Sequence, residues 1–352
     1  MSQVENSPVV PVPGAGSFLR GLPWLALIFV FAFLSWAVWE PFFSQFMEPA
    51  AAQFASIGMG PQGAYLVCIM AMAGNWPVAG IQNPWVRGIA MIVLAKVITA
   101  AFWLILICGF DFDIVKWGFP LIANSWLILS ITSFVGGDAH LAHIPPVRRM
   151  FLNLLISVGF TVVLMQTIVI FPAQWFPFLQ TLLITGSASY FFRRVKQPTY
   201  SFLVWPLLLG LMWFGLVVAT YCGYYQVATE PTQFWVWTLG TSTPEFDLFF
   251  ALACGFNFAV FACIQCWPFC RIPQPWAAVV AVLCMIVWCV ALTPIVGSVF
   301  SSLAPENPLW QAQIMAWHMV FWGFSWVYCF GIGQTPYRWI NQKTAGTWDD
   351  VN

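Results

Sequence analysis

Residues 84–108 read PWVRGIAMIVLAKVITAAFWLILIC, an unbroken and almost wholly apolar run. An α-helix rises 1.5 Å per residue, so a run of this length can cross the roughly 30 Å hydrocarbon core of a bilayer. Its charges are Arg87, near the start, and Lys96, near the middle. The run therefore predicts a membrane-spanning helix that carries a lysine at mid-depth.

Comparable apolar runs recur along the whole chain. The ten expected spans are 23–40, 61–77, 84–108, 119–137, 147–171, 176–193, 200–222, 244–267, 276–298 and 308–332. Charged residues make up 7% of the sequence and hydrophobic residues 61%, which is typical of polytopic membrane proteins. We expect an all-α polytopic membrane protein, with one ten-helix transmembrane domain at 23–332 between cytoplasmic tails at 1–22 and 333–352.

Lysine and arginine gather in alternate gaps between the runs. These gaps hold Arg20, Arg87, Arg148, Arg149, Arg193, Arg194, Lys196, Arg271, Arg338 and Lys343. The opposite gaps hold Lys116 and mostly acids, namely Glu48, Asp111, Asp113, Glu230 and Glu306. Because cytoplasmic loops carry the excess of Lys and Arg, the sequence predicts a multi-pass protein of a bacterial inner (plasma) membrane with both termini cytoplasmic.

Proline divides the ten runs into pairs. The junctions Gln82-Asn83-Pro84, Lys196-Gln197-Pro198 and Pro273-Gln274-Pro275 resemble one another, and junctions of this kind recur about every 60 residues, as tandem repeats do. A general preference of proline for the first helical turn explains the positions but not the similarity. The sequence predicts five tandem helical hairpins at about 23–77, 84–137, 147–193, 200–267 and 276–332.

The two members of each predicted hairpin differ in composition. Even-numbered runs carry small, hydroxyl and amide residues, whereas odd-numbered runs are mostly uniform in Leu, Val, Ile, Phe and Trp. Small residues allow close helix packing in lipid, and polar residues turn away from acyl chains. We expect the even-numbered helices to face a shared interior, and 147–171, with Asn153, Ser157 and Thr161, to be an inner helix as well.

Lys96 and His318 are predicted to lie at similar depths. Lys96 is about 12 residues into its run and His318 about 10 residues past Pro308 on an oppositely directed helix, or roughly 18 Å and 15 Å from opposite surfaces. A mid-membrane charge usually faces a cavity or a partner, so the two side chains are candidates for one site. The alternative is structural: a lysine packed in its neutral form or bonded to backbone carbonyls, and a buried, hydrogen-bonded histidine.

The remaining candidate pathway residues come from the even-numbered helices. The full set is Lys96, His318, Gln311, Gln313, Asn257, Asn124, Asn75, Glu245 and Asp247. Glu245 and Asp247 follow Thr243-Pro244, which is a good helix start, and acids there also stabilise the positive end of the helix dipole. Together with Glu40 they would form an acidic vestibule on the outer side.

Two clusters contain metal-binding residue types. Asp138, His140 and His143 have a spacing that fits one helical turn, although an ordinary polar junction explains them better. Around Trp267-Pro268 lie Cys263, Cys266 and Cys270, and the sequence shows no fourth ligand nearby. Whether this cluster binds anything stays open, and no cofactor is predicted.

Together these features favour an integral membrane transporter or channel for a small solute, with a polar site at mid-membrane. The alternative is a membrane anchor or quinone-interacting subunit of a respiratory or redox complex, for which haem or quinone is a possible cofactor. An intramembrane lipid enzyme using Asp138, His140 and His143 is a third reading, but no nucleotide-binding or hydrolase motif occurs, so an enzyme on its own is disfavoured. Expected partners are the lipid bilayer, the solute, and partner subunits or a homo-oligomer, without nucleic acid.

Overall fold

The described part of the chain is helical apart from one small ribbon. The computed structural model describes residues 15–114, 117–118, 121–122, 144–170, 222–223, 225–227, 240–242, 245, 248–249, 251–253, 263, 267–268, 272 and 276–330. The helices are α1 (Ala15–Phe43), α2 (Pro49–Gly58), α3 (Pro61–Met72), α4 (Pro84–Leu104), the π-helix η1 (Ile105–Gly109), α6 (Pro146–Ile170), α10 (Trp276–Leu303) and α11 (Pro308–Phe330). The strands β1 (Tyr225–Val227) and β2 (Gly240–Ser242) pair antiparallel, in a segment expected to be a loop.

By length and composition, five helices in the described residues are apolar enough to cross a membrane. They are Phe18–Phe43, Pro49–Ala71, Pro84–Gly109, Pro146–Val163 and Ile286–Leu303. The expectation of a helical protein with helices of membrane-spanning length and composition is therefore confirmed. Of the ten expected spans, those at 119–137, 176–193 and 200–222 and most of 244–267 lie outside the described residues.

Two helix starts differ from the expectation. The first helix begins at Ala15 rather than Pro23, and Arg20 Nε donates to the carbonyl oxygen of Gly16 within the added turn. Proline inside a membrane helix is tolerated where neighbouring groups take over the lost hydrogen bond. The second span begins at Pro49 rather than Pro61, because the expected polar gap is in fact the helix α2.

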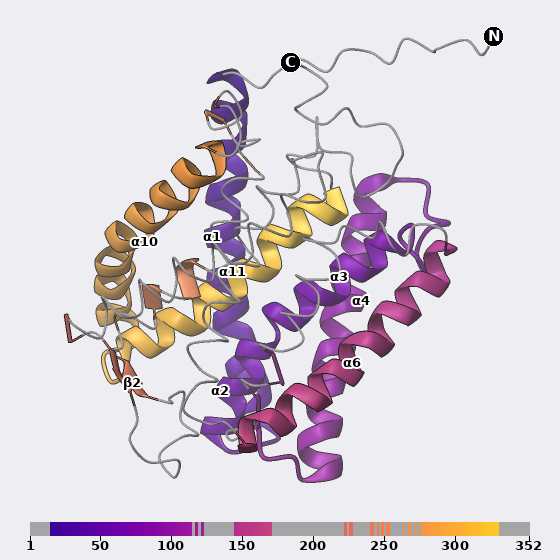
Figure 1. Cartoon of the computed structure of the whole chain (residues 1–352), viewed down its shortest axis with the longest axis horizontal. Coiled ribbons are helices and arrows are strands. Elements are labelled where there is room, and N and C mark those ends of the chain that lie inside the picture. The colour runs from indigo at the N-terminus through magenta and orange to yellow at the C-terminus, as the bar shows by residue number, and fades with distance from the viewer. Residues whose placement is uncertain are drawn as a thin grey trace.

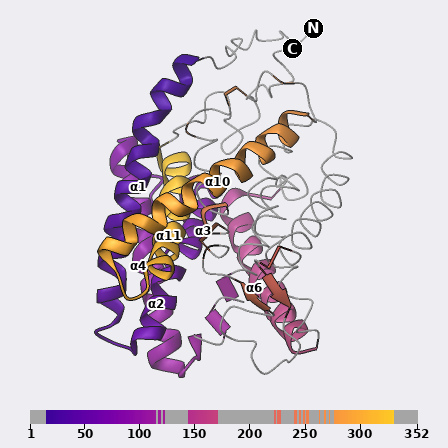
Figure 2. The ribbon, with the colours of Figure 1, turned by 90° about the vertical axis from the view of Figure 1, so that its left-hand side faces the viewer.

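The last helix of the described part, α11, runs through the middle of the molecule. It packs against α1, α2, α3, α4 and α10, and Figure 1 shows it crossing between α10 and α1 on one side and α3 and α4 on the other. In Figure 2, after a quarter turn, α10 crosses in front of it. The C-terminal helices therefore lie against the N-terminal ones.

Burial separates the inner helices from the outer ones. In the most apolar window of each span, 89% of the residues of Pro49–Ala71 are buried, against 22% for α1 and 33% for α4 with η1. In α11, every residue from Gln311 to Cys329 except Trp322 is buried. The segments Pro49–Ala71 and Pro308–Phe330, both expected to face inward, are thus buried in the described part of the chain.

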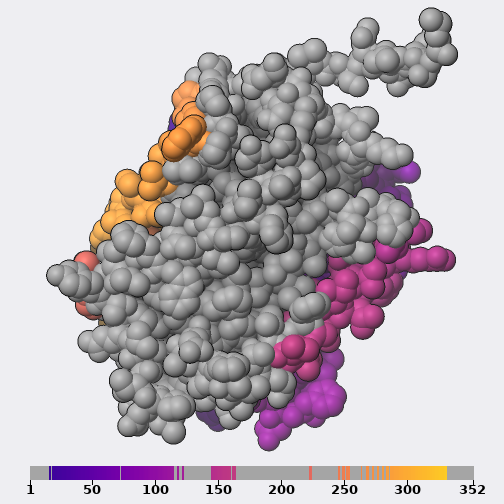
Figure 3. All heavy atoms as spheres, in the orientation of Figure 1, coloured from indigo at the N-terminus to yellow at the C-terminus, as the bar shows by residue number. Residues whose placement is uncertain are grey.

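The outer helices keep apolar faces exposed. Leu155 and Val158 of α6 are exposed, as are Leu283 and Val287 of α10. Figure 3 shows these two helices on opposite flanks of one face of the molecule, α10 in orange and α6 in magenta. The segment 147–171 was expected to be an inner helix, but the described part of α6 is peripheral; only its polar face, with Asn153, Ser157 and Thr161, is buried.

Candidate functional site

The second span is interrupted in the sequence Gly58-Met59-Gly60-Pro61, which we call the helix break. The backbone N–H of Gly60 donates to Ile57 O at 2.9 Å, a short-range bond that closes the last turn of α2. Pro61 then starts α3 and has no N–H to donate backward. Interrupted helices at membrane depth occur where the freed backbone groups find other partners.

Glycine allows two other helices to approach the helix break closely. A Cβ atom on Gly58 would overlap the Nε1 atom of Trp103 in α4, and one on Gly60 would overlap the carbonyl oxygen of Trp317 in α11. On Gly63 it would lie 2.8 Å from Phe321 Cδ2. Since real Cβ atoms do not make such contacts, only glycine fits, and α11 and α4 are held against the helix break.

Lys96 of α4 reaches the helix break from the side. Its Nζ atom donates a 2.8 Å hydrogen bond to the carbonyl oxygen of Met59, and the side chain is buried. The same nitrogen lies 3.7 Å from the ring centroid of Phe321 and 5.7 Å from that of Trp39. A cation at a helix C-terminus is favoured by the helix dipole, and aromatic faces attract it further.

No described residue supplies a carboxylate ion pair to Lys96, which contacts one carbonyl and two aromatic rings. A buried charge normally requires pairing or several hydrogen bonds. The described neighbours therefore accept only one hydrogen bond from the amine of Lys96.

His318 of α11 completes the centre of the site. Its Nε2 atom lies 3.2 Å from the hydroxyl oxygen of Ser56 in α2. The ring is fully buried, and Nδ1 has no hydrogen-bond partner among the described residues. Phe321, which lies under Lys96, follows His318 by one helical turn, so residues of one α11 face meet both ends of the helix break.

A hydrogen-bonded network joins α1, α2 and α11 on the Glu40 side of this centre. Glu40 Oε1 accepts from Gln53 Nε2 at 3.0 Å and from Gln311 Nε2 at 3.3 Å. Trp36 Nε1 donates to Gln311 Oε1 at 2.6 Å, and Trp310 Nε1 donates to Gln53 Oε1 at 2.7 Å. Both amides thus use their donor and acceptor ends, which fixes their orientation.

Polar side chains recur every seven residues along one face of α11. Gln311, His318 and Ser325 are all buried, and a spacing of seven places them on the same side of a helix. We call this row the polar seam; at 1.5 Å per residue it covers about 21 Å. Ser325 Oγ has no hydrogen-bond partner among the described residues.

A second polar contact lies between α3 and α6. The hydroxyl of Tyr65 donates to Ser157 Oγ at 2.7 Å. Asn153, one turn earlier on α6, is buried, and within the described residues neither its Oδ1 nor its Nδ2 has a partner. The inward face of α6 therefore presents hydrogen-bonding groups to the interior.

The structure brings Lys96, His318 and Gln311 to one region and places other predicted residues elsewhere. Gln313 is buried on α11, but it is two residues from Gln311 and so lies on a different face. Asn75 lies in the turn after α3 with a φ of 66°, a conformation that asparagine tolerates. Its backbone N–H donates to Met70 O at 2.9 Å, so Asn75 terminates the helix.

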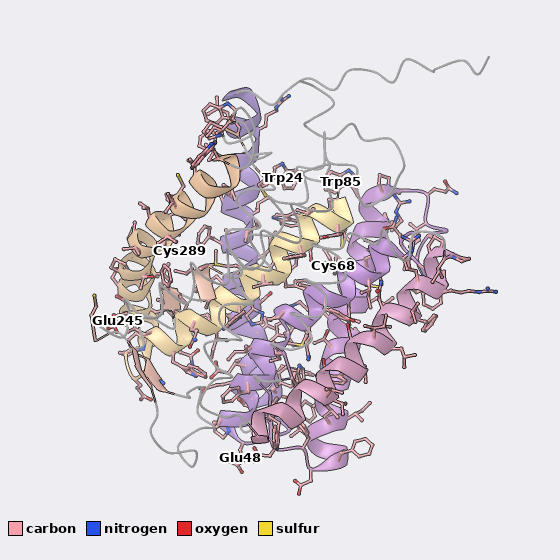
Figure 4. All side chains as sticks on the ribbon, viewed as in Figure 1. Trp24, Glu48, Cys68, Trp85, Glu245 and Cys289 are labelled. Carbon is pink, nitrogen blue, oxygen red and sulfur yellow. The ribbon has the colours of Figure 1, made fainter. Side chains whose placement is uncertain are left out.

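The expected acidic vestibule is only partly described. Glu245 is exposed and is drawn at the α10 edge of the view in Figure 4, far across the picture from Trp85. Glu40 is engaged by Gln53 and Gln311. Asp247, Asn124 and Asn257 lie outside the described residues.

The metal candidates also fall largely outside the described part. This applies to Asp138, His140, His143, Cys266 and Cys270, whereas Cys263 is described and buried. Within the described ranges, no three His, Cys, Asp or Glu side chains gather as a metal site would require.

Sequence reasoning missed the helix break itself. The apolar runs predict Gly58-Met59-Gly60-Pro61 as the end of a gap before a helix, and they do not single out Ser56, Gln53 or Trp103. Two glycines before a proline inside a stretch with few charges were the available signal, since they permit close packing and an interruption.

Comparison of the chain with protein-family models, curated proteins and solved structures finds no significant match. The function is therefore inferred from the geometry of the site.

Proposed function

We propose that this protein is an integral membrane transporter or channel for a small solute, with its central site at the helix break. The observation that carries the proposal is the buried ammonium of Lys96 bonded to the carbonyl of Met59, where the second span is interrupted. Interrupted helices at membrane depth typically line cavities or bind solutes and ions. A lysine at that depth is costly, about 3 kcal/mol on insertion scales, and is usually functional.

The polar seam supports a passage rather than an isolated site. Gln311, His318 and Ser325 follow one face of α11, and α11 is surrounded by α1, α2, α3, α4 and α10. Polar side chains on packed helices in lipid form hydrogen bonds to neighbouring helices, as Gln311 does to Trp36 and Glu40. A row of amide, imidazole and hydroxyl groups also provides successive hydrogen-bonding positions for a solute.

We further propose ten spans in five hairpins, with both termini cytoplasmic, in a bacterial inner membrane. Packing of α11 against α1 to α4 supports a ring in which the last hairpin meets the first. The labelled residues support the orientation: Trp24 and Trp85, close to Arg20 and Arg87 in sequence, lie at one end of the bundle in Figure 4, and Glu48 lies at the other. The lipid bilayer and the solute are the proposed partners.

Flux through reconstituted vesicles tests the transport proposal. Purified protein is placed in vesicles, and the entry of glycerol, urea, potassium ions and chloride is followed separately by light scattering or trapped dyes. At least one probe is expected to enter faster than into protein-free vesicles. Gln311→Leu, which removes a seam group, should slow that probe, whereas Val287→Ala on the exposed face of α10 should not.

Two results would contradict the proposal. One is that no probe enters faster than into protein-free vesicles, with monodisperse protein incorporated. The other is a specific flux that Gln311→Leu leaves unchanged, which would place the passage away from the polar seam.

A further inference from the structure

We infer that the helix break binds a small monovalent anion, and, if the proposed transport function holds, that the transported solute belongs to this class. The amine of Lys96 and the indole of Trp103 both keep donor capacity that the described residues leave unused, beside one unpartnered acceptor, Gln62 Oε1. The argument starts from Lys96, because its ammonium has three N–H donors. One of these donates to Met59 O at 2.8 Å.

Trp103 adds a donor that the described residues leave unused. It lies seven residues after Lys96 on α4, on the same face, and it is fully buried. Its indole Nε1 lies against Gly58, at the end of α2, and has no hydrogen-bond partner among the described residues. An indole N–H donates and cannot accept, so an acceptor is missing beside the helix break.

The start of α3 adds donor groups, whereas the free nitrogen of His318 donates or accepts according to the tautomer. The Nδ1 atom of His318 is buried without a described partner, while Nε2 faces Ser56. Gly60, the residue before α3, makes no side-chain cap, and the first-turn N–H groups of a helix carry partial positive charge. The helix break therefore combines an ammonium, a free indole N–H and a helix N-terminus.

A negative ion satisfies these groups together. It supplies the acceptor that Trp103 lacks, and it neutralises Lys96, to which no described residue offers a carboxylate. Since Lys96 is the one cation among the described groups at the helix break, a single negative charge balances it. Gly58, Gly60 and Gly63 hold α4 and α11 in close contact, which favours an ion of few atoms.

Chloride binding to the purified full chain is the test. Thermal unfolding in detergent is measured with increasing sodium chloride, replacing sodium gluconate at constant ionic strength. A ligand that binds the folded state raises the unfolding temperature saturably. Wild type and the matched control Val97→Ala, on the exposed side of α4, should both show this rise.

The variants Lys96→Gln and Trp103→Phe remove one donor group each. Lys96→Gln removes a charge-assisted hydrogen bond to the anion. The free energy of such a bond corresponds to a loss of chloride affinity of roughly tenfold or more. Trp103→Phe keeps an aromatic ring without the N–H and should weaken it several-fold. If Lys96→Gln does not fold, chloride binding by Trp103→Phe tests the inference alone. This variant is expected to fold because the phenyl ring fits the space of the indole.

The inference is overturned if chloride gives wild type no rise beyond that in gluconate, or if the rise is the same in Trp103→Phe. Flux measurements in vesicles distinguish a failure of the anion site from a failure of the transport proposal. Vesicles that pass glycerol or potassium but not chloride would leave transport standing and remove the anion as the solute. Saturable chloride binding without any flux would keep the anion site and remove transport.

Discussion

The ammonium of Lys96 and the carbonyl oxygen of Met59 lie 2.8 Å apart, and this hydrogen bond joins the middle of one membrane-type helix to the interruption of another. It explains how a lysine is accommodated among apolar residues: the cation occupies the negative end of α2, with Phe321 beneath it. The helix break and the lysine thus stabilise each other.

Close packing at Gly60 should be essential for folding. In Gly60→Ala the added methyl would overlap the backbone oxygen of Trp317, which cannot rotate away as a side chain can. Overpacking of this kind costs about 1–3 kcal/mol, and we expect the unfolding temperature in detergent to fall accordingly. Gly159→Ala on α6 is the control, because nothing lies within 4 Å of its Cβ position; equal effects of the two changes would show that α11 does not approach Gly60.

The two amides that share Glu40 Oε1 should be energetically coupled. Gln53→Ala and Gln311→Ala each remove a donor to the same oxygen, so the double variant should lose less stability than the sum of the singles, by about 0.5 kcal/mol or more. A double-mutant cycle of unfolding free energies measures this. Pairing Gln53→Ala with Ser298→Ala, whose hydroxyl bonds within α10, should be additive; a Gln53–Gln311 pair that is equally additive would disprove the network.

The proposed topology places two fusion proteins on opposite sides of the membrane. A fluorescent protein fused after Asn352 should fluoresce, because both termini are proposed to be cytoplasmic. Alkaline phosphatase inserted after Glu306 should be active, because that acidic turn is proposed to face outward. The reverse pair of results would require an odd number of spans or the opposite orientation.

Helices with strong local signals could be predicted from the sequence. Asn83 and Pro84 predict the start of α4, and in the structure Asn83 Oδ1 accepts from the backbone N–H groups of Trp85 at 2.9 Å and Val86 at 3.3 Å, as an N-cap does. Pro308 begins α11, since proline suits the first turn of a helix. The inward position of α11 followed from its amide and histidine residues.

Hydropathy alone does not predict the helix α2. Its sequence, PAAAQFASIG, is only moderately apolar, although alanine favours helix strongly and Pro49 suits a first turn. Burial against α11, which helps to stabilise this segment, depends on residues about 260 positions away, as the bond of Trp310 to Gln53 shows. No local pattern contains such a contact.

The central site was predicted in part. Similar depths for Lys96 and His318 could be calculated from helix rise alone, and the structure brings both to the helix break. The carbonyl that Lys96 contacts could not be anticipated, because its availability depends on where α2 ends. That end is set by the packing of Gly58 and Gly60 against two distant helices.

Flux in vesicles containing Lys96→Met, compared with Val97→Met, tests the central claim most directly. The two changes introduce the same side chain at adjacent positions of α4, one buried at the helix break and the other exposed. We predict that Lys96→Met abolishes the flux of the solute that wild type passes, while Val97→Met retains it, with both proteins incorporated equally. Undiminished flux in Lys96→Met would contradict a passage through the helix break.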